Sequence, residues 1–143
     1  MTEPVITRAL SVRPPWWWFI LHSKKPVENR DWPTTFRGRV LLHASKWYVH
    51  RDVIDDIWYV RRLFPGVVTP DAHPYEWLKT HGGCIVGSVE ITDCVTKYDS
   101  EWFSGKYGFL LSNPVAFEKP VPFKGALGFF YVPPSITVEA LRG

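Results

Sequence analysis

Proline is the residue that most restricts how this chain can fold. Thirteen prolines are spread through its 143 residues. A proline inside a helix removes a backbone hydrogen bond and clashes with the preceding turn, so this content limits long helices and favours short strands joined by turns. The chain has the length of one domain, and we expect a single domain over residues 1–143.

Hydrophobic spacing predicts the individual elements. We expect strands over residues 5–12, 38–44, 84–95, 107–112 and 128–132, an extended piece over 27–30, a short helix over 16–23 and one or two helical turns over 75–81. The best helix covers residues 47–64, where apolar side chains recur every three or four positions, with Ser45 as its N-cap. Alternation along 84–95 predicts a strand with one face formed by Ile85, Gly87, Val89 and Ile91. A kink is expected at 113–114 and an excursion at 65–75.

This set of elements indicates the fold class. Five or six short strands with a short N-terminal helix and one longer helix predict an α+β protein built as a compact β-barrel. A barrel pairs the sheet edges that would otherwise invite aggregation. A doubly wound parallel sheet is disfavoured, because strands and helices do not alternate in the second half of the chain.

The sequence carries no sign of a membrane segment or a secretory leader. No apolar run approaches the length of about 20 residues that crosses a bilayer. The first residues lack the basic start and apolar core of a signal peptide. We therefore expect a cytoplasmic protein without a membrane partner.

Signatures of several enzyme and metal-binding classes are absent. There is no glycine-rich dinucleotide or phosphate loop, no zinc-protease helix and no serine-hydrolase elbow. Cys84 and Cys94 lack the paired spacing of a zinc site and are expected as small strand residues in a reducing compartment. Neither a metal nor an organic cofactor is expected.

Charge is distributed unevenly along the chain. Residues 1–51 carry nine basic and three acidic side chains, a balance of +6, against +3 for the whole chain. A basic, aromatic-rich first third suits an anionic or nucleobase-bearing partner. The alternative is a solvated basic surface without a specific partner.

The densest group of reactive side chains lies in residues 24–30, Lys-Lys-Pro-Val-Glu-Asn-Arg. If residues 26–30 are extended, Glu28 and Arg30 share one face and present a carboxylate and a cation to one pocket, beside Lys25. The alternative is a surface loop with solvated charges.

A second candidate is 43–46, His-Ala-Ser-Lys, where a strand leads into a helix N-terminus. Unpaired N–H groups there favour anions, with Ser45 and Lys46 adding polar contacts; the alternative is an ordinary N-cap beside a packed His43.

The aromatic residues form the third candidate group, consisting of Trp16, Trp17, Trp18, Trp32, Trp102 and Tyr107. Three consecutive tryptophans cannot all face one core on a helix of 3.6 residues per turn. At least one is therefore expected to face a cleft or a base, where stacking contributes about 1–3 kcal/mol per base. The alternative is that these rings are core residues. We expect that to be true of about half of the six.

Three segments stand out together: Leu-Ser-Val-Arg-Pro-Pro-Trp at 10–16, Lys-Pro-Val-Glu-Asn-Arg at 25–30 and Gly-Arg-Val-Leu-Leu-His-Ala-Ser-Lys at 38–46. In this order they resemble the ASCH domain, a branch of the PUA-like superfamily of small β-barrels. Residues 87–94 resemble its central strand, and Trp102 and residues 107–111 resemble its late loop and strand. The likeness covers nearly the whole chain.

The resemblance implies a function as well as a fold. PUA-like barrels commonly bind RNA, and related barrels bind modified bases. The ASCH cleft lies between the barrel and its helices and is lined by the region that corresponds to 25–30. One small family member removes the acetyl group from N4-acetylcytidine, and another is described as a ribonuclease. The amidohydrolase uses a lysine, a threonine three residues later and a downstream glutamate. Lys25 matches the lysine and Glu101 follows in the order of the glutamate, whereas Glu28 occupies the threonine position.

The sequence therefore predicts an ASCH-type barrel that binds RNA, another single-stranded nucleic acid or a modified nucleoside in a basic, Trp-lined cleft. Expected stacking residues are Trp16 or Trp17, Trp32 and Trp102, with Tyr107 nearby. Lys25, Arg30, Ser45 and Lys46 are expected at phosphate or ribose, and Glu28 at a base edge. The rival is a metal-independent amidohydrolase or ribonuclease that uses Lys25, Glu28 and Glu101. A third hypothesis is a protein-interaction module with a large apolar patch.

Overall fold

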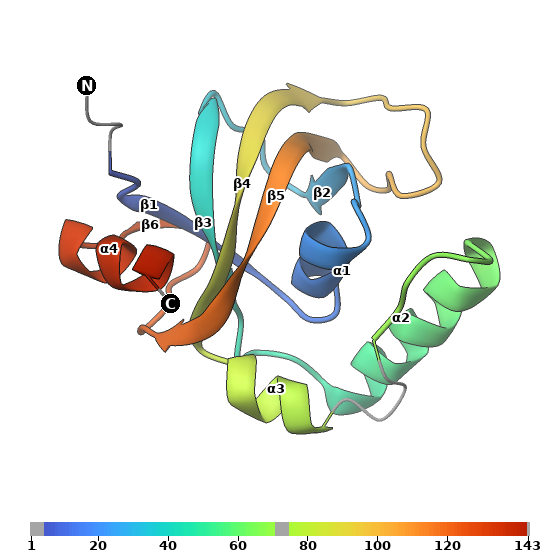
Figure 1. Ribbon diagram of the computed structural model, residues 1–143. Coiled ribbons are helices and arrows are strands. Elements are labelled where there is room, and N and C mark those ends of the chain that lie inside the picture. The colour runs from blue at the N-terminus through green and yellow to red at the C-terminus, as the bar shows by residue number, and fades with distance from the viewer. Residues whose placement is uncertain (1–4, 71–74, 143) are drawn as a thin grey trace.

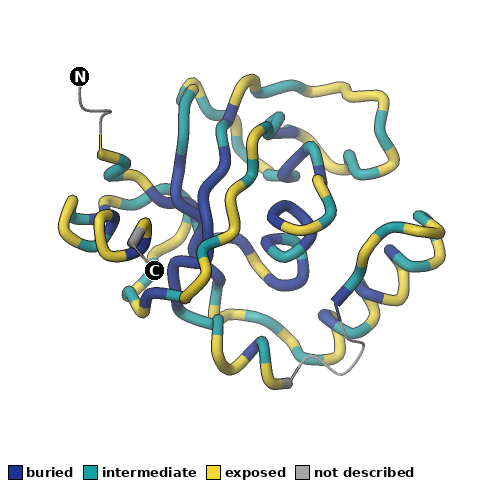
Figure 2. Tube along the Cα trace, viewed as in Figure 1, coloured by how far each residue is buried: buried dark blue, intermediate teal, exposed yellow. Residues whose placement is uncertain are grey.

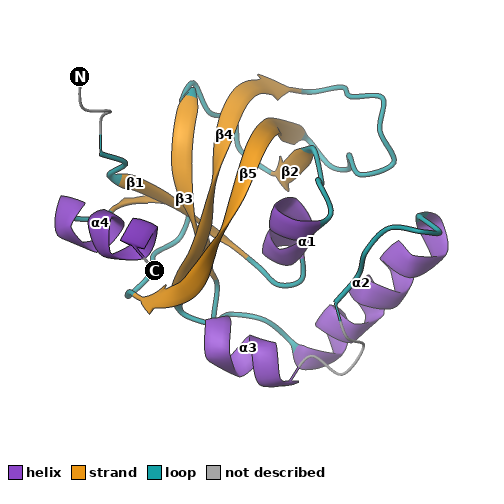
Figure 3. Ribbon diagram, in the orientation of Figure 1, coloured by secondary structure: helices purple, strands orange, loops and turns teal. Residues whose placement is uncertain are grey.

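The computed structural model describes residues 5–70 and 75–142. In chain order the elements are β1 (Arg8–Val12), α1 (Trp16–His22), β2 (Val27–Arg30), β3 (Gly38–Ala44), α2 (His50–Leu63), α3 (Tyr75–His81), β4 (Cys84–Val95), β5 (Tyr107–Pro122), β6 (Phe129–Tyr131) and α4 (Pro134–Arg142). Figure 3 shows the strands gathered at the centre and the helices around them.

All six strands belong to one curled sheet, in the order β2-β5-β4-β3-β1-β6 (Figure 1). β1 and β3 run parallel, whereas the other neighbouring strands are antiparallel. The parallel pair arises because the chain leaves β1 through α1 and β2, on the far edge of the sheet, before it returns as β3. The curled half-barrel with four helices confirms the expected α+β barrel class.

β3 and the first half of β4 are largely buried on both faces, because alternate side chains enter two different cores (Figure 2). On the α1 side the core includes Leu10, Val12, Trp17, Val40 and Leu42. On the α4 side it includes Ala9, Leu41, Ile85, Val132 and Ala140. The sequence analysis did not predict α4, which is a short helix anchored by burial of Thr137 and Ala140.

The predicted start of the long helix is wrong. α2 begins at His50, and Val49 occupies the N-cap without a side-chain hydrogen bond. Ser45 instead accepts a hydrogen bond from the backbone N–H of Trp47 at 3.1 Å. Residues 45–49 therefore form a connection between β3 and α2, and the expected anion site at a helix N-terminus directly after the strand does not form.

The expected alternation along β4 is also wrong. Val86 and Val89 lie in the same core cluster, although residues three apart on a regular strand face opposite sides. Irregular pairing with β5 between Ile85 and Gly87, and again between Ser88 and Glu90, changes the phase. β5 itself continues past the expected kink, with Asn113 at φ 51°, as far as Pro122.

The remaining elements differ from expectation mainly at their ends. β1 begins at Arg8, β6 covers Phe129–Tyr131, and the expected helical turns at 75–81 are confirmed as α3. The predicted excursion at 65–75 lies partly outside the described residues. Cys84 is buried, Cys94 is half-buried, and both are free thiols. Within the described chain, no helix has the length and apolar character needed to cross a membrane.

Candidate functional site

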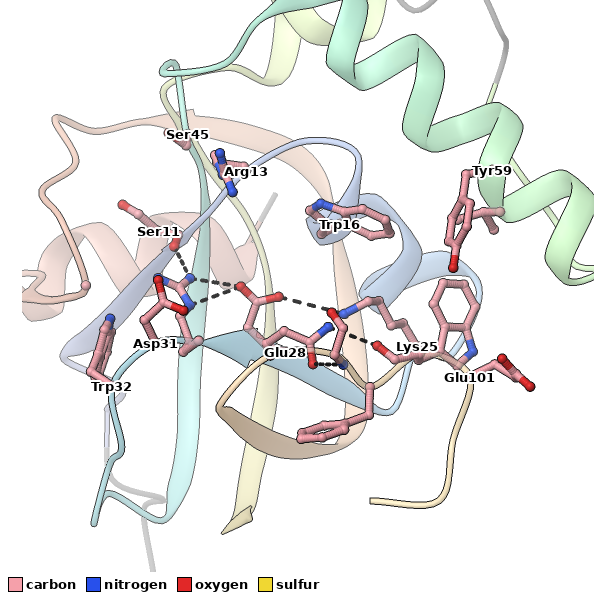
Figure 4. Close-up of a pocket in the computed structure, with 18 of the residues that line it drawn as sticks. Ser11, Arg13, Trp16, Lys25, Glu28, Asp31, Trp32, Ser45, Tyr59 and Glu101 are labelled. Carbon is pink, nitrogen blue, oxygen red and sulfur yellow. Dashed lines mark hydrogen bonds and ion pairs between the residues drawn. The ribbon is translucent and has the colours of Figure 1, made fainter. Parts of the chain in front are cut away.

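A cavity of about 560 Å³ lies between the sheet, α1 and α2. The ends of β1 and β3, the first turn of α1 and strand β2 supply one side (Figure 4). α2 and the loop between β4 and β5 supply the other, through Tyr59, Phe64 and residues 101–105. Its volume is within the range of about 300–1,000 Å³ typical of small-molecule sites.

The floor of the cavity is an ion cluster of Lys25, Glu28 and Arg30. The Arg30 guanidinium holds Glu28 Oε2 from two nitrogens, Nε at 3.1 Å and Nη2 at 3.0 Å. It also donates to the backbone oxygen of Ser11. Lys25 Nζ lies 3.8 Å from Glu28 Oε1 and donates to the backbone oxygen of Val27. The cluster thus joins the turn after α1, β2 and β1.

Local backbone geometry explains why these three side chains meet. Lys24 has a left-handed φ of 56°, and the backbone N–H of Lys25 donates to Phe19 O at 3.1 Å. This turn closes α1 and brings Lys25 into the interior. Glu28 and Arg30 then share a face of β2, as the two-residue period predicts.

Between them on β2, Asn29 fixes the loop after β4. Its amide donates to the Trp102 backbone oxygen at 2.9 Å and accepts from the Ser104 N–H at 3.1 Å. Both ends of the Asn29 amide are therefore used in holding the cavity wall.

Burial controls the electrostatics of the floor. Lys25 is 3% exposed and Glu28 is 7% exposed. Burial lowers the pKa of the Lys25 amine, while the Glu28 charge acts in the opposite direction and Arg30 lowers it further. Loss of hydration thus favours the neutral amine, as it does for a lysine taken out of water.

Three of the predicted tryptophans line the cavity. Trp16 lies over Lys25 Nζ, with 5.5 Å between the nitrogen and the ring centroid. Trp32 lies 5.7 Å from the Arg30 guanidinium carbon. Trp102 stacks on Phe64 of α2, with centroids 4.1 Å apart and planes at 11°.

Other predicted site residues lie elsewhere. Trp17 is 2% exposed and packs against Trp77 and His81 in the core. Adjacent residues of a helix point in different directions. Trp17 therefore faces the core, whereas Trp16 faces the cavity. Lys46 is exposed and lies outside the cavity lining. Tyr107, on β5, is the backbone partner of Arg30 on β2, and it also lies outside the cavity lining. Ser45 and Glu101 do line the cavity, with Glu101 exposed at its edge.

The expected basic character of the cleft is wrong. Its lining carries three basic and three acidic side chains, which are Arg13, Lys25, Arg30, Glu28, Asp31 and Glu101. The excess positive charge of residues 1–51 therefore lies largely on other surfaces. No group of three His, Cys, Asp or Glu residues able to hold a metal ion occurs within residues 5–70 and 75–142.

The sequence analysis missed several lining residues. Arg13 belongs to the 10–16 segment already singled out, so a signal for it existed. Tyr59 and Phe64 had no such signal, because the packing of α2 beside the loop after β4 decides their position.

A family model and two curated proteins match this chain. The family model described as "ASCH domain" matches residues 10–121. Human activating signal cointegrator 1 is 27% identical over 126 residues, which cover 81% of this chain and 20% of that protein. The mouse protein of the same name is 26% identical over the same length and coverage. This chain spans about a fifth of the length of those relatives, and it belongs to the ASCH domain family.

Proposed function

We propose that the cavity binds a nucleobase carried by RNA or by a modified nucleoside. The observation that supports this most directly is the state of the Glu28 carboxylate. Oε2 is held by Arg30 at 3.0 and 3.1 Å, whereas Oε1 lies 3.8 Å from Lys25 Nζ, beyond hydrogen-bond length. Oε1 therefore retains acceptor capacity in a buried site, where a ring N–H or exocyclic amine of a base forms a strong, charge-assisted bond.

The walls supply the second requirement of base recognition, which is stacking. Trp16 and Trp32 flank the Glu28 carboxylate in Figure 4. Trp102 has one face covered by Phe64, so we assign the stacking role first to Trp16 and Trp32. The PUA-like fold of the family also suggests RNA binding.

Lys25 and Arg30 have a different role in this proposal from direct phosphate binding. Both cations are paired with Glu28, so they keep the buried carboxylate charged and fix its orientation. Recognition then depends on the donor pattern of the base more than on backbone charge.

The experiment is calorimetric titration with adenosine, guanosine, cytidine, uridine and N4-acetylcytidine, using wild type and Glu28→Gln. Loss of one hydrogen bond to a charged acceptor is worth about 1.5–3 kcal/mol, so we expect binding to weaken about 10- to 100-fold. Glu90→Gln is the matched control, because Glu90 lies on β4, bonds Asn113 at 2.9 Å and is outside the cavity lining. Equal affinities of Glu28→Gln and wild type would refute the role of Glu28. The absence of binding to any of these nucleosides and to single-stranded RNA would refute the proposed function.

A second candidate function is hydrolysis in the same cavity, and the buried Lys25 is the observation that favours it. Its lowered pKa increases the fraction of neutral amine, which a base or nucleophile requires. In this scheme water cleaves the amide of N4-acetylcytidine into acetate and cytidine, with Glu28 or Glu101 as the proton acceptor.

The test is incubation of the protein with N4-acetylcytidine and with single-stranded RNA, followed by chromatography. Product formation that Lys25→Met abolishes and Glu90→Gln retains would establish the hydrolase. Tight binding without product would leave the binding function alone.

A further inference from the structure

We propose that Arg13 and Trp47 form a second subsite beside the cavity, which holds the nucleotide adjacent to the base bound at Glu28. We call these two residues the rim. The inference rests on the proposed function and makes it more specific: the ligand is a single strand of at least two nucleotides, and a free nucleoside fills only half of the site.

The topology of the sheet places the rim. Arg13 follows the last residue of β1, and Ser45 follows the last residue of β3. These strands are parallel, Val12 pairs with Ala44, and the Ser45 N–H donates to Val12 O at 3.0 Å. Arg13 and Ser45 therefore leave the sheet side by side, at the edge of the cavity in Figure 4.

Ser45 also determines the conformation of the connection that carries Trp47. Its Oγ accepts the Trp47 N–H at 3.1 Å, a local turn that serine commonly forms. Trp47 lines the same cavity as Glu28. The Trp47 ring is therefore carried by a connection that Ser45, two residues earlier, fixes to the end of β1.

Packing does not account for Trp47, which is 82% exposed. Stacking on an aromatic ring is the main sequence-independent contact that single-stranded nucleic acids make. Trp47 offers such a ring beside a cavity whose own tryptophans are half-buried.

The charge distribution supports the same assignment. Lys25 and Arg30 are both paired with Glu28. Arg13 is exposed, and its charge acts on Asp56, but it forms no ion pair within 4.0 Å in the described part of the chain. Arg13 is therefore the lining cation most able to meet the phosphate that links two nucleosides.

The acidic groups near Arg13 restrict the direction of the strand. A hollow on its other side contains Asp52, Asp55 and Asp56 from the first half of α2. These carboxylates repel a phosphate backbone. A strand that contacts Arg13 is thus directed toward the cavity that Trp47 lines and away from Asp52, Asp55 and Asp56.

The experiment compares nucleosides with the dinucleoside monophosphates ApA, GpG, CpC and UpU by calorimetry. Wild type should bind the best dinucleoside monophosphate about 5- to 100-fold more tightly than the matching nucleoside, which corresponds to stacking one base on an aromatic ring. Trp47→Ala should remove this gain, so that its ratio of dinucleotide to nucleoside affinity falls toward the statistical factor. Trp58→Ala is the matched control, because Trp58 is 54% exposed on α2 and lies outside the cavity lining.

Salt dependence tests Arg13 separately. The ratio of dinucleotide to nucleoside affinity should fall with salt, with a logarithmic slope of about −0.7 for one phosphate contact on a single strand. Arg13→Gln should flatten this slope, and Arg51→Gln, an exposed arginine paired with Asp55, should retain it.

The outcomes separate the two proposals. If nucleosides bind in the cavity but dinucleotides gain no more than the statistical factor for two identical bases, the second subsite is refuted and the proposed function stands. Trp47→Ala behaving as wild type would refute it equally. If neither nucleosides nor dinucleotides bind, the proposed function itself fails, and the second subsite with it.

Discussion

Replacing Lys25 with methionine tests how the buried ion cluster is balanced. The substitution removes the ammonium group but retains an unbranched side chain of similar length. Glu28 keeps Arg30 as its partner, through contacts of 3.0 and 3.1 Å, whereas the contact that it loses is 3.8 Å long. The substituted protein therefore retains the shorter and better-oriented of the two ion pairs.

The magnitude follows from that difference. A buried charge that loses its partner usually destabilises a protein by about 3–5 kcal/mol, while replacing buried charges by apolar groups is often neutral or stabilising. Because Arg30 still neutralises Glu28 and the desolvation cost of Lys25 disappears, we expect Lys25→Met to unfold within about 1 kcal/mol of wild type. Lys25→Ala should be less stable than Lys25→Met by about 2–4 kcal/mol, because it leaves a cavity under Trp16.

The pH dependence has a definite sign. Burial lowers the pKa of Lys25 from its ordinary 10.5, so on raising the pH the folded state loses this proton before the unfolded state does. The resulting cost to stability is complete below the folded-state pKa and disappears as the pH rises toward 10.5. Wild type should therefore gain stability relative to Lys25→Met between about pH 7 and pH 10.

The free energies of unfolding of wild type, Lys25→Met and Lys25→Ala are measured by urea denaturation at about pH 7 and about pH 10. A loss above about 3 kcal/mol in Lys25→Met would mean that Glu28 depends on Lys25 for neutralisation. A stability difference between wild type and Lys25→Met that does not change with pH would contradict the direction of the Lys25 pKa shift.

Two further predictions concern the framework around the site. Gly108→Ala should destabilise the protein by about 1–3 kcal/mol through overpacking, because a Cβ there lies 2.7 Å from Val27 Cγ2 and 2.8 Å from the Phe103 ring; an unchanged urea midpoint would show that the Phe103 loop yields freely. Burial lowers the pKa of His43 from 6.5, so the unfolded state binds the proton first as the pH falls. Stability should decrease from about pH 7 downward and level off below the folded-state pKa. His43→Gln should show a smaller decrease in urea melts, and identical slopes would contradict the assignment.

Short-range patterns in the sequence were enough to predict the secondary structure that depends on neighbours in the chain. The apolar run Val40–Leu42 and the alternation in β2 gave strands that the structure contains. The shared face of Glu28 and Arg30 followed from the same two-residue period. Contacts between distant residues determined the rest: α4 owes its stability to burial of Thr137 and Ala140 beside the sheet, and a helix this short has weak local preference.

The candidate site shows the same division. The sequence predicted that Glu28 and Arg30 would share one face beside Lys25, and that three adjacent tryptophans could not share one core. Only the tertiary structure decided that Trp16 faces the cavity while Trp17 fills the core, because the position of α1 against the sheet sets the rotation of the helix. The same holds for Arg13 and Trp47. Their place beside Glu28 depends on the parallel pairing of β1 with β3, a long-range contact whose partners lie about thirty residues apart and which no local periodicity encodes.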